Sequence, residues 1–180
     1  MKGIFELEMA AEPEGENLLL VDCLNLAFRY KHKRQRDFAA DFVRTIESFA
    51  RSYSCGKVIL CADKGKSAYR LGIFPEYKGN RDEKFKDQTD EDRKLFAEFL
   101  EDFEDALALA KLRYPCLRFQ GVEADDIVSV VCKLSKRRVW IISTDRDFDQ
   151  LVCDRVSRFC YYTRKEITVD SPEDDLQFLQ

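Results

Sequence analysis

Two short stretches of this chain carry acidic side chains whose types and spacing could bind a metal ion. The first has Glu123, Asp125 and Asp126 at the point where a helix is expected to begin. The second has Asp145 and Asp147, which follow an apolar strand. Carboxylates with no His or Cys beside them suit Mg²⁺ or Mn²⁺. Because crowded acids repel one another unless cations neutralise them, the pattern favours a magnesium site for phosphate chemistry, although helix capping alone would explain one or two of these acids.

Two further acids follow predicted strands nearer the start of the chain. The apolar strands are expected at 17–21, 57–62 and 139–143, and an acid follows each within two residues: Asp22, Asp63 and Asp145. Continuous apolar runs are typical of parallel strands that are buried on both faces. Open α/β sheets bind their ligands at the carboxyl ends of such strands. We therefore expect these three acids to converge with the Glu123 cluster at one edge of the sheet.

Basic side chains are concentrated in two segments that could contact phosphate. Residues 28–36, which we expect to form a loop, interleave five cations with two aromatic residues and the only histidine. Residues 64–86 carry seven cations together with Tyr77, and they directly follow Asp63. Cations with neighbouring aromatic rings suit a nucleic-acid backbone and its bases. The first segment, taken by itself, is more typical of a solvated loop.

The composition describes a single globular domain of 180 residues, 45% hydrophobic and 36% charged. Its net charge of −4 argues against a general nucleic-acid coat, but not against an enzyme whose local charge contacts nucleic acid. The apolar runs are too short to cross a membrane, and no secretory signal is evident. The seven scattered cysteines include no CxxC pair, which indicates free thiols in a reducing cytosol rather than a zinc site.

Strand-like and helix-like segments alternate along the chain, which predicts an α/β fold with a central, mostly parallel sheet between helical layers. Helices are expected at 38–53, 90–112, 123–134 and 148–152, with a last one opening at Ser171. Further strands are expected at 116–119, 156–162 and 167–169, after a loosely held tail at 1–16. The acidic face of helix 90–112 is interpreted as solvated, without a functional role.

Five of these stretches together resemble the 5′-nuclease, or flap endonuclease, family, and most closely its phage members. They are residues 21–25, 62–67, 74–81, 121–126 and 143–147, in the family's order and spacing. The resemblance implies a three-layer α/β/α, PIN-like nuclease domain over 17–180 with a helical arch at about 76–112. It also implies Mg²⁺-dependent, structure-specific cleavage of DNA near a 5′ end, as a flap endonuclease or 5′-3′ exonuclease in replication or repair.

The resemblance assigns roles to individual residues. The implied metal-binding acids are Asp22, Asp63, Glu123, Asp125, Asp126, Asp145 and Asp147, with two Mg²⁺ or Mn²⁺ ions. From its position in the sequence, we expect Asp145 to lie between the two clusters, where it would bridge both ions, and to be catalytic together with Lys78 and Arg81. Lys78 and Arg81 resemble the family's active-site cations, and Tyr77 resembles its base-stacking residue. The predicted DNA-binding residues are Arg29, Lys31, Lys66, Arg70, Tyr77, Lys78 and Arg81.

The chain departs from the family pattern at its C-terminus. Family members continue into a further Asp-bearing segment, which completes the second metal site, and a helix–three-turn–helix module that contacts the duplex; we expect this chain to lack both. The chain could be truncated, half of a split protein or a reduced form. We expect a well-formed first metal site, an incomplete second site and weak duplex binding. The expected partner is DNA with a 5′ flap or 5′ end, bound by a monomer without membrane contact, in the bacterial host cytoplasm if a phage encodes the chain.

Three other functions share part of this pattern. A phosphatase with an aspartate nucleophile needs a second Asp two residues after the strand-end acid, and Leu24 stands there after Asp22. A PIN-like ribonuclease would share the acids but usually lacks the 77–81 segment. A catalytically impaired DNA-binding remnant is the third. The favoured chemistry is two-metal phosphodiester hydrolysis, with ions roughly 4 Å apart.

Overall fold

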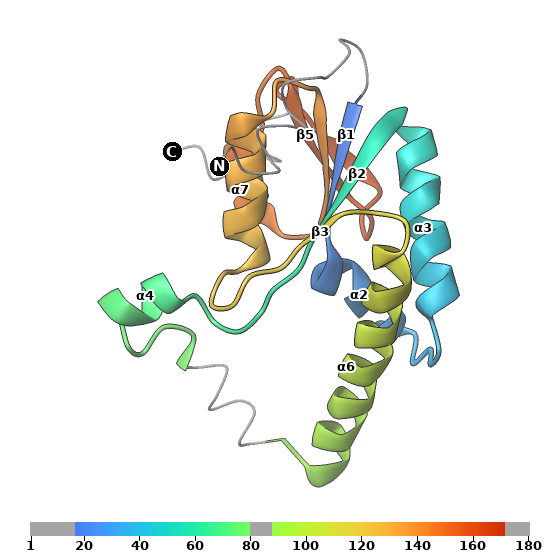
Figure 1. The fold of residues 1–180 in the computed structure, drawn as a ribbon, viewed down its shortest axis with the longest axis vertical. Coiled ribbons are helices and arrows are strands. Elements are labelled where there is room, and N and C mark those ends of the chain that lie inside the picture. The colour runs from blue at the N-terminus through green and yellow to red at the C-terminus, as the bar shows by residue number, and fades with distance from the viewer. Residues whose placement is uncertain (1–16, 80–87, 172–180) are drawn as a thin grey trace.

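A mostly parallel sheet forms the centre of the molecule in the computed structural model, which describes residues 17–79 and 88–171 (Figure 1). Within these residues the sheet has six strands in the order β3-β2-β1-β4-β5-β6. The strands are β1 (Asn17–Asp22), β2 (Cys55–Cys61), β3 (Cys116–Leu117), β4 (Val139–Ile142), β5 (Val156–Cys160) and β6 (Lys165–Ile167). The first five are parallel, and β6 runs antiparallel to β5. This confirms the predicted fold class.

Helices cover both faces of the sheet. They are α2 (Cys23–His32), α3 (Ala39–Ser52), α4 (Ala68–Ile73), α6 (Asp90–Lys111) and α7 (Ala124–Leu134), with a 3-10 helix at Arg146–Leu151. Side chains alternate along β1: Leu19 and Val21 pack in the core formed with α2, α3 and α6, whereas Leu18 and Leu20 pack against α7. Figure 1 shows α7 on one side of the sheet and α3 and α6 on the other.

The register of β1 brings the carboxyl ends of three strands together. Asp22, the last residue of β1, pairs with Cys61 of β2, and Val21 pairs with Ile142 of β4. The chain therefore leaves β1, β2 and β4 at the same edge of the sheet, as the positions of the acids predicted. In a sheet of this type, that edge is the place for a ligand site.

Two interpretations of charged segments were wrong. Residues 28–32 are not loop, because α2 continues through His32, with Leu26, Ala27 and Tyr30 buried on its inner face. The acidic face of α6 is not wholly solvated either, because Asp102 is only 6% exposed and accepts a hydrogen bond from Arg36 Nε. The sequence of α6 did not show this contact, since Arg36 comes from a segment far earlier in the chain.

Helix α4 was not predicted from the sequence, whereas the other remaining elements differ little from expectation. The 3-10 helix lies where a short helix was predicted behind Asp147, and the last strand ends two residues earlier than expected, at Ile167. A turn precedes that strand, with Arg164 in a left-handed conformation at φ 57°. The predicted tail at 1–16 and the helix expected after Ser171 lie outside the described residues. Among the described helices, none has both the length and the apolar character needed to cross a membrane.

Because β1 is the central strand, its side chains should determine stability. We expect Leu20→Ala, at a fully buried position, to lower the free energy of unfolding by about 2–5 kcal/mol. Leu112→Ala, at a position 81% exposed, should change it by less than about 0.5 kcal/mol. Urea denaturation followed by circular dichroism measures both, and equal losses would contradict this description of the core.

Candidate metal centre and its cations

Asp22 lies buried at the carboxyl end of β1, where it is the N-cap of α2. One carboxylate oxygen accepts from the Asn25 backbone N–H at 3.3 Å, and the other accepts from the Ser143 hydroxyl at 3.0 Å. Burial, followed by the negative charge of Asp63, raises the pKa of Asp22 to about 7. A cation bound nearby would therefore stabilise the ionised form of Asp22.

Asp63 follows β2 and connects this edge of the sheet to α7. Its Oδ1 accepts from the backbone N–H of Ala124, the first residue of α7, at 2.8 Å. Its backbone carbonyl accepts from Arg118 Nε at 2.9 Å. The carboxylate thus caps the helix that carries Asp125 and Asp126, and this contact brings acids from β2 and α7 together.

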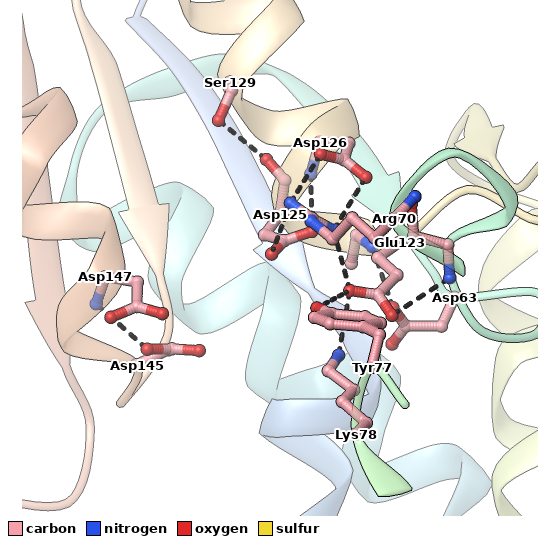
Figure 2. A network of polar contacts seen from close by, with 12 residues as sticks. Asp63, Arg70, Tyr77, Lys78, Glu123, Asp125, Asp126, Ser129, Asp145 and Asp147 are labelled. Atoms are coloured by element: carbon pink, nitrogen blue, oxygen red, sulfur yellow. Dashed lines mark hydrogen bonds and ion pairs between the residues drawn. The ribbon is translucent and has the colours of Figure 1, made fainter. Parts of the chain in front are cut away.

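Glu123 is the most enclosed acid of the cluster, at 3% exposure. Its Oε2 accepts from Arg70 Nη1 at 2.8 Å, Lys78 Nζ at 2.8 Å and the Tyr77 hydroxyl at 3.0 Å (Figure 2). Its Oε1 accepts from the Ser67 backbone N–H at 3.2 Å. Burial by itself would raise the pKa of Glu123, but the hydrogen bonds from Lys78, Tyr77 and Ser67 outweigh it and lower this pKa. Glu123 is therefore held as a carboxylate.

Arg70 spans the two neighbouring acids of α7. Its guanidinium binds Asp126 through two hydrogen bonds, of 2.8 and 3.1 Å, and contacts Asp125 at 3.5 Å. Burial raises the pKa of Asp125, and Arg70 acts against this effect. Arg70 was predicted to bind DNA; in this structure it lies among predicted metal ligands, which no spacing in the sequence indicated.

A glycine allows the segment that carries Arg70 to approach the acids. Gly121 has φ +71°, and a Cβ there would lie 2.9 Å from the Ala68 side chain. The Ala68 N–H donates to the Gly121 carbonyl at 2.9 Å, and the Gly121 N–H donates to the Lys64 carbonyl at 2.8 Å. Ser67 then caps α4 by accepting from the Arg70 N–H. In the sequence Gly121-Val122-Glu123, the glycine therefore allows the chain before α4 to pack closely, and the glutamate supplies a carboxylate to the site.

Asp145 and Asp147 form a second, more exposed cluster. Figure 2 shows both on the far side of β1 from Glu123 and Arg70. Asp145 caps the 3-10 helix by accepting from the Asp147 N–H at 3.0 Å, and its own N–H donates to Ser143 Oγ at 3.1 Å. Because Ser143 also donates to Asp22, one hydroxyl links the acid of β1 to the acid that follows β4.

The structure thus brings the predicted acids to one edge of the sheet, in two groups. Asp63, Glu123, Asp125 and Asp126 gather around α7, and Asp22 connects through Ser143 to Asp145. Within residues 17–79 and 88–171, no three His, Cys, Asp or Glu side chains surround a common point as a ready metal cage. The cations that contact these acids are Arg70, which binds Glu123 and Asp126, and Lys78, which binds Glu123.

The other predicted DNA-binding residues lie in different surroundings. Arg29 lines a cavity of about 1160 Å³ whose described lining holds basic and aromatic side chains and no carboxylate. Lys31 lies over the ring of Phe96, 4.4 Å from its centroid, so it also packs α2 against α6. Lys66 is half-buried and directly precedes Ser67, the N-cap of α4. Arg81 lies outside the described residues.

Several residues that hold the site were not singled out from the sequence. The Asn25 side chain accepts from the Thr144 N–H at 2.9 Å, and the Asn25 carbonyl accepts from the Tyr161 hydroxyl. Asn25 lay in the stretch 21–25 that resembles the family, but no role was assigned to it. Arg158 was detectable as a charge inside a buried strand, but the sequence does not identify its partner, Asp149.

Comparison with known proteins agrees with this arrangement. Residues 17–175 match the family described as the 5′-3′ exonuclease, N-terminal resolvase-like domain. The flap endonuclease of Escherichia phage T5 is 47% identical over 165 residues, which cover 89% of this chain and 56% of the phage protein. The chain therefore spans little more than half the length of this relative.

Two solved structures from phage T5 have the same fold. A T5 5′-exonuclease with bound zinc ions superposes with a TM-score of 0.83 at 46% identity, over 86% of this chain and 59% of that one. A T5 flap endonuclease in a pseudo-enzyme–product complex with DNA and metal ions gives a TM-score of 0.80 at 46% identity, over 85% and 58%. The resemblance stated from the sequence motifs is confirmed.

The raised pKa of Asp22 predicts a pH-dependent gain in stability when its charge is removed. The unfolded carboxyl has a pKa near 3.8, so the folded protein binds the extra proton between about pH 4 and pH 7 and loses stability as pH rises through this range. Asp22→Asn should stabilise the metal-free protein by about 1–3 kcal/mol above pH 7 and by little near pH 4. Denaturation at both pH values tests this, and a gain that does not depend on pH would contradict it.

Proposed function

Because the chain belongs to the 5′-3′ exonuclease family through its N-terminal resolvase-like domain, we propose that it is a metal-dependent 5′ nuclease that hydrolyses DNA phosphodiester bonds near a 5′ end. The observation that carries this proposal is that Lys78 and Tyr77 bond Glu123, next to the strand-end acid Asp63, at one edge of the sheet. Flap endonuclease and 5′-3′ exonuclease activity are both within the proposal, in DNA replication or repair.

The acids fit divalent metal ions. All the donors are oxygen atoms, which suit Mg²⁺ and Mn²⁺. Asp22 is buried near Asp63 with a raised pKa, so a cation there would relieve both desolvation and repulsion. Asp63, Glu123, Asp125 and Asp126 would hold one ion, and Asp145 and Asp147 would contribute to a second. When bound, such ions supply Lewis-acid chemistry for phosphodiester hydrolysis.

Lys78 would stabilise the charge that develops on the transferring phosphate. Its ammonium contacts Glu123 and lies 5.1 Å from the centroid of the Tyr77 ring. The Lys78 backbone is left-handed, with φ 57°. A DNA phosphate at this edge would offer Lys78 a new anionic partner, at the moment when charge increases there. Arg81 is proposed to assist in the same way.

DNA binding would use the basic side chains around the acids. The Arg70 guanidinium and the half-buried Tyr77 ring adjoin the cluster, with the guanidinium 5.6 Å from the ring centroid. The Tyr77 ring is proposed to stack on a base of the DNA. Arg29 and its basic cavity adjoin the Thr144–Arg146 side of the site, and Lys31 and Lys66 would add phosphate contacts. The DNA complex of the T5 flap endonuclease supports DNA as the partner.

A second candidate is DNA binding with impaired cleavage. It is favoured by the exposure of Asp145 and Asp147, whose described hydrogen bonds stay within residues 143–147, from the Asp145 N–H to Ser143 Oγ and from the Asp147 N–H to Asp145 Oδ1. Cleavage of a 5′-labelled DNA flap, across a titration of Mg²⁺ and Mn²⁺, separates the two candidates. The same flap made of RNA tests the ribonuclease alternative.

We expect Asp126→Asn to weaken Mg²⁺ binding at least about 10-fold, because it removes one charge from the α7 acids. It should also abolish flap cleavage at low Mg²⁺. The matched control is Glu101→Gln, an exposed acid on α6, which should leave both unchanged. Titration calorimetry and the flap assay provide the measurements; unaltered Mg²⁺ affinity in Asp126→Asn would remove this residue from the metal site.

We expect Lys78→Ala to lower the single-turnover cleavage rate by about 10²–10³-fold, with a much smaller loss of DNA affinity, because its charge acts mainly in the transition state. Lys133→Ala, at an exposed position on α7, serves as the charge-matched control. If Lys78→Ala instead loses affinity at a constant single-turnover rate, Lys78 is a ground-state phosphate contact.

A further inference from the structure

A buried arginine on β5 lies behind the loop that carries Asp145 and Asp147. The Arg158 side chain is 3% exposed, and its carboxylate partner Asp149, in the 3-10 helix, is fully buried. Arg158 Nε donates to Asp149 Oδ1 at 2.5 Å, and its Nη2 donates to Oδ2 at 2.9 Å. This paired geometry restricts both side chains, because the planar guanidinium matches the two carboxylate oxygens.

The same guanidinium also reaches the end of β4. Its Nη1 donates to the Ser143 backbone carbonyl at 3.1 Å, and the Ser143 N–H donates to the Phe159 carbonyl of β5 at 3.2 Å. Arg158 therefore joins β5, the 3-10 helix and the residue that follows β4. The loop from Ser143 to Asp149 is held at both of its ends by one side chain.

From Ser143 the contacts continue directly to the acids. The Ser143 hydroxyl donates to Asp22 and accepts from the Asp145 N–H, and Asp145 in turn accepts from the Asp147 N–H. Each of these distances lies between 3.0 and 3.1 Å. A shift of the Ser143 backbone would therefore change the relative placement of three predicted metal ligands.

We propose that Arg158 and Asp149 are positioning residues for the metal site, which fix the positions of Asp145 and Asp147 relative to Asp22. This inference rests on the proposed function, since it assumes that these acids bind divalent cations. Arg158 is too enclosed to contact a DNA phosphate itself, although it borders the basic cavity. A buried ion pair is also weak evidence for stability alone, because well-packed apolar replacements are often as stable.

The decisive variants remove the pair without leaving a buried charge. Arg158→Met combined with Asp149→Val replaces both groups by apolar side chains of similar total volume, which favours a folded protein. Arg158→Lys is the conservative variant: it keeps a cation beside Asp149 but cannot make the paired contact and reach Ser143 at once. The control is Arg155→Lys, because Arg155 donates to the Cys132 carbonyl of α7 at 2.6 Å and not to the acid-bearing loop.

Mn²⁺ binding to the metal-free chain, followed by electron paramagnetic resonance, gives a readout that does not depend on cleavage. The double variant should keep its thermal unfolding midpoint but bind Mn²⁺ about 10-fold or more weakly, the usual effect of losing a residue that orients metal ligands. Arg158→Lys should show a smaller loss, and Arg155→Lys none. Any loss of DNA cleavage should be restored by raising Mn²⁺, with the KM for DNA unchanged.

The outcomes separate this inference from the function on which it rests. Wild-type Mn²⁺ affinity in both Arg158 variants overturns the positioning role and leaves the metal site intact. Equal weakening by Arg155→Lys also overturns it, because the effect would then be general. If the wild-type chain itself binds no Mn²⁺, the metal site fails and the inference fails with it. Should the double variant not fold, Arg158→Lys against Arg155→Lys decides the question.

Discussion

Repulsion among carboxylates at one edge of the sheet is the constraint on which the rest of this structure depends. The parallel strands β1, β2 and β4 end together, and acids follow each of them. The two most enclosed acids of the site respond in opposite ways: the pKa of Glu123 is lowered by its cationic and hydrogen-bond partners, whereas that of Asp22 is raised by burial and by Asp63. Arg70 and Lys78 therefore neutralise part of the charge on the α7 side, whereas the described hydrogen bonds of Asp22 come from Asn25 and Ser143, which carry no charge.

On the α7 side of the site, the cations come from α4 and the residues after it, a segment with few buried apolar side chains. Helix α4 buries none of its residues, and it is drawn away from the sheet in Figure 1. The segment reaches the sheet through polar contacts, namely the Gly121–Ala68 backbone bond and the bonds of Arg70, Tyr77 and Lys78 to the acids. Its position is thus coupled to the charge of the acid cluster, because most of these contacts are electrostatic.

The Asp145 side of the site is built in the contrasting way. Arg158 and Asp149 hold its loop from inside the protein, where water cannot compete for the hydrogen bonds. The exposed acids Asp145 and Asp147 therefore stand on a rigid support, even though their own side chains face solvent. The α7 side of the site is thus held by contacts with Arg70 and Lys78, whereas the Asp145 side is held by the buried Arg158–Asp149 pair.

Local patterns in the sequence were sufficient to predict the strands, the edge at which they end and the family. Apolar runs followed by acids predicted parallel strands that end at one edge, and the spacing of the motifs identified the family, now confirmed over residues 17–175. These features depend on neighbouring residues and on the general geometry of parallel sheets, so they can be read without coordinates.

Only the tertiary structure decided which charges meet. Arg70 lies more than fifty residues from the acids it contacts, and Ser143 lies 121 residues from Asp22. Helix α2 extends into the basic segment because its inner face packs in the core, which turns Lys31 toward the ring of Phe96. Such partners are chosen by packing between distant segments, and nothing in the local sequence around Arg158 identifies Asp149 or Ser143 as the groups it will bind.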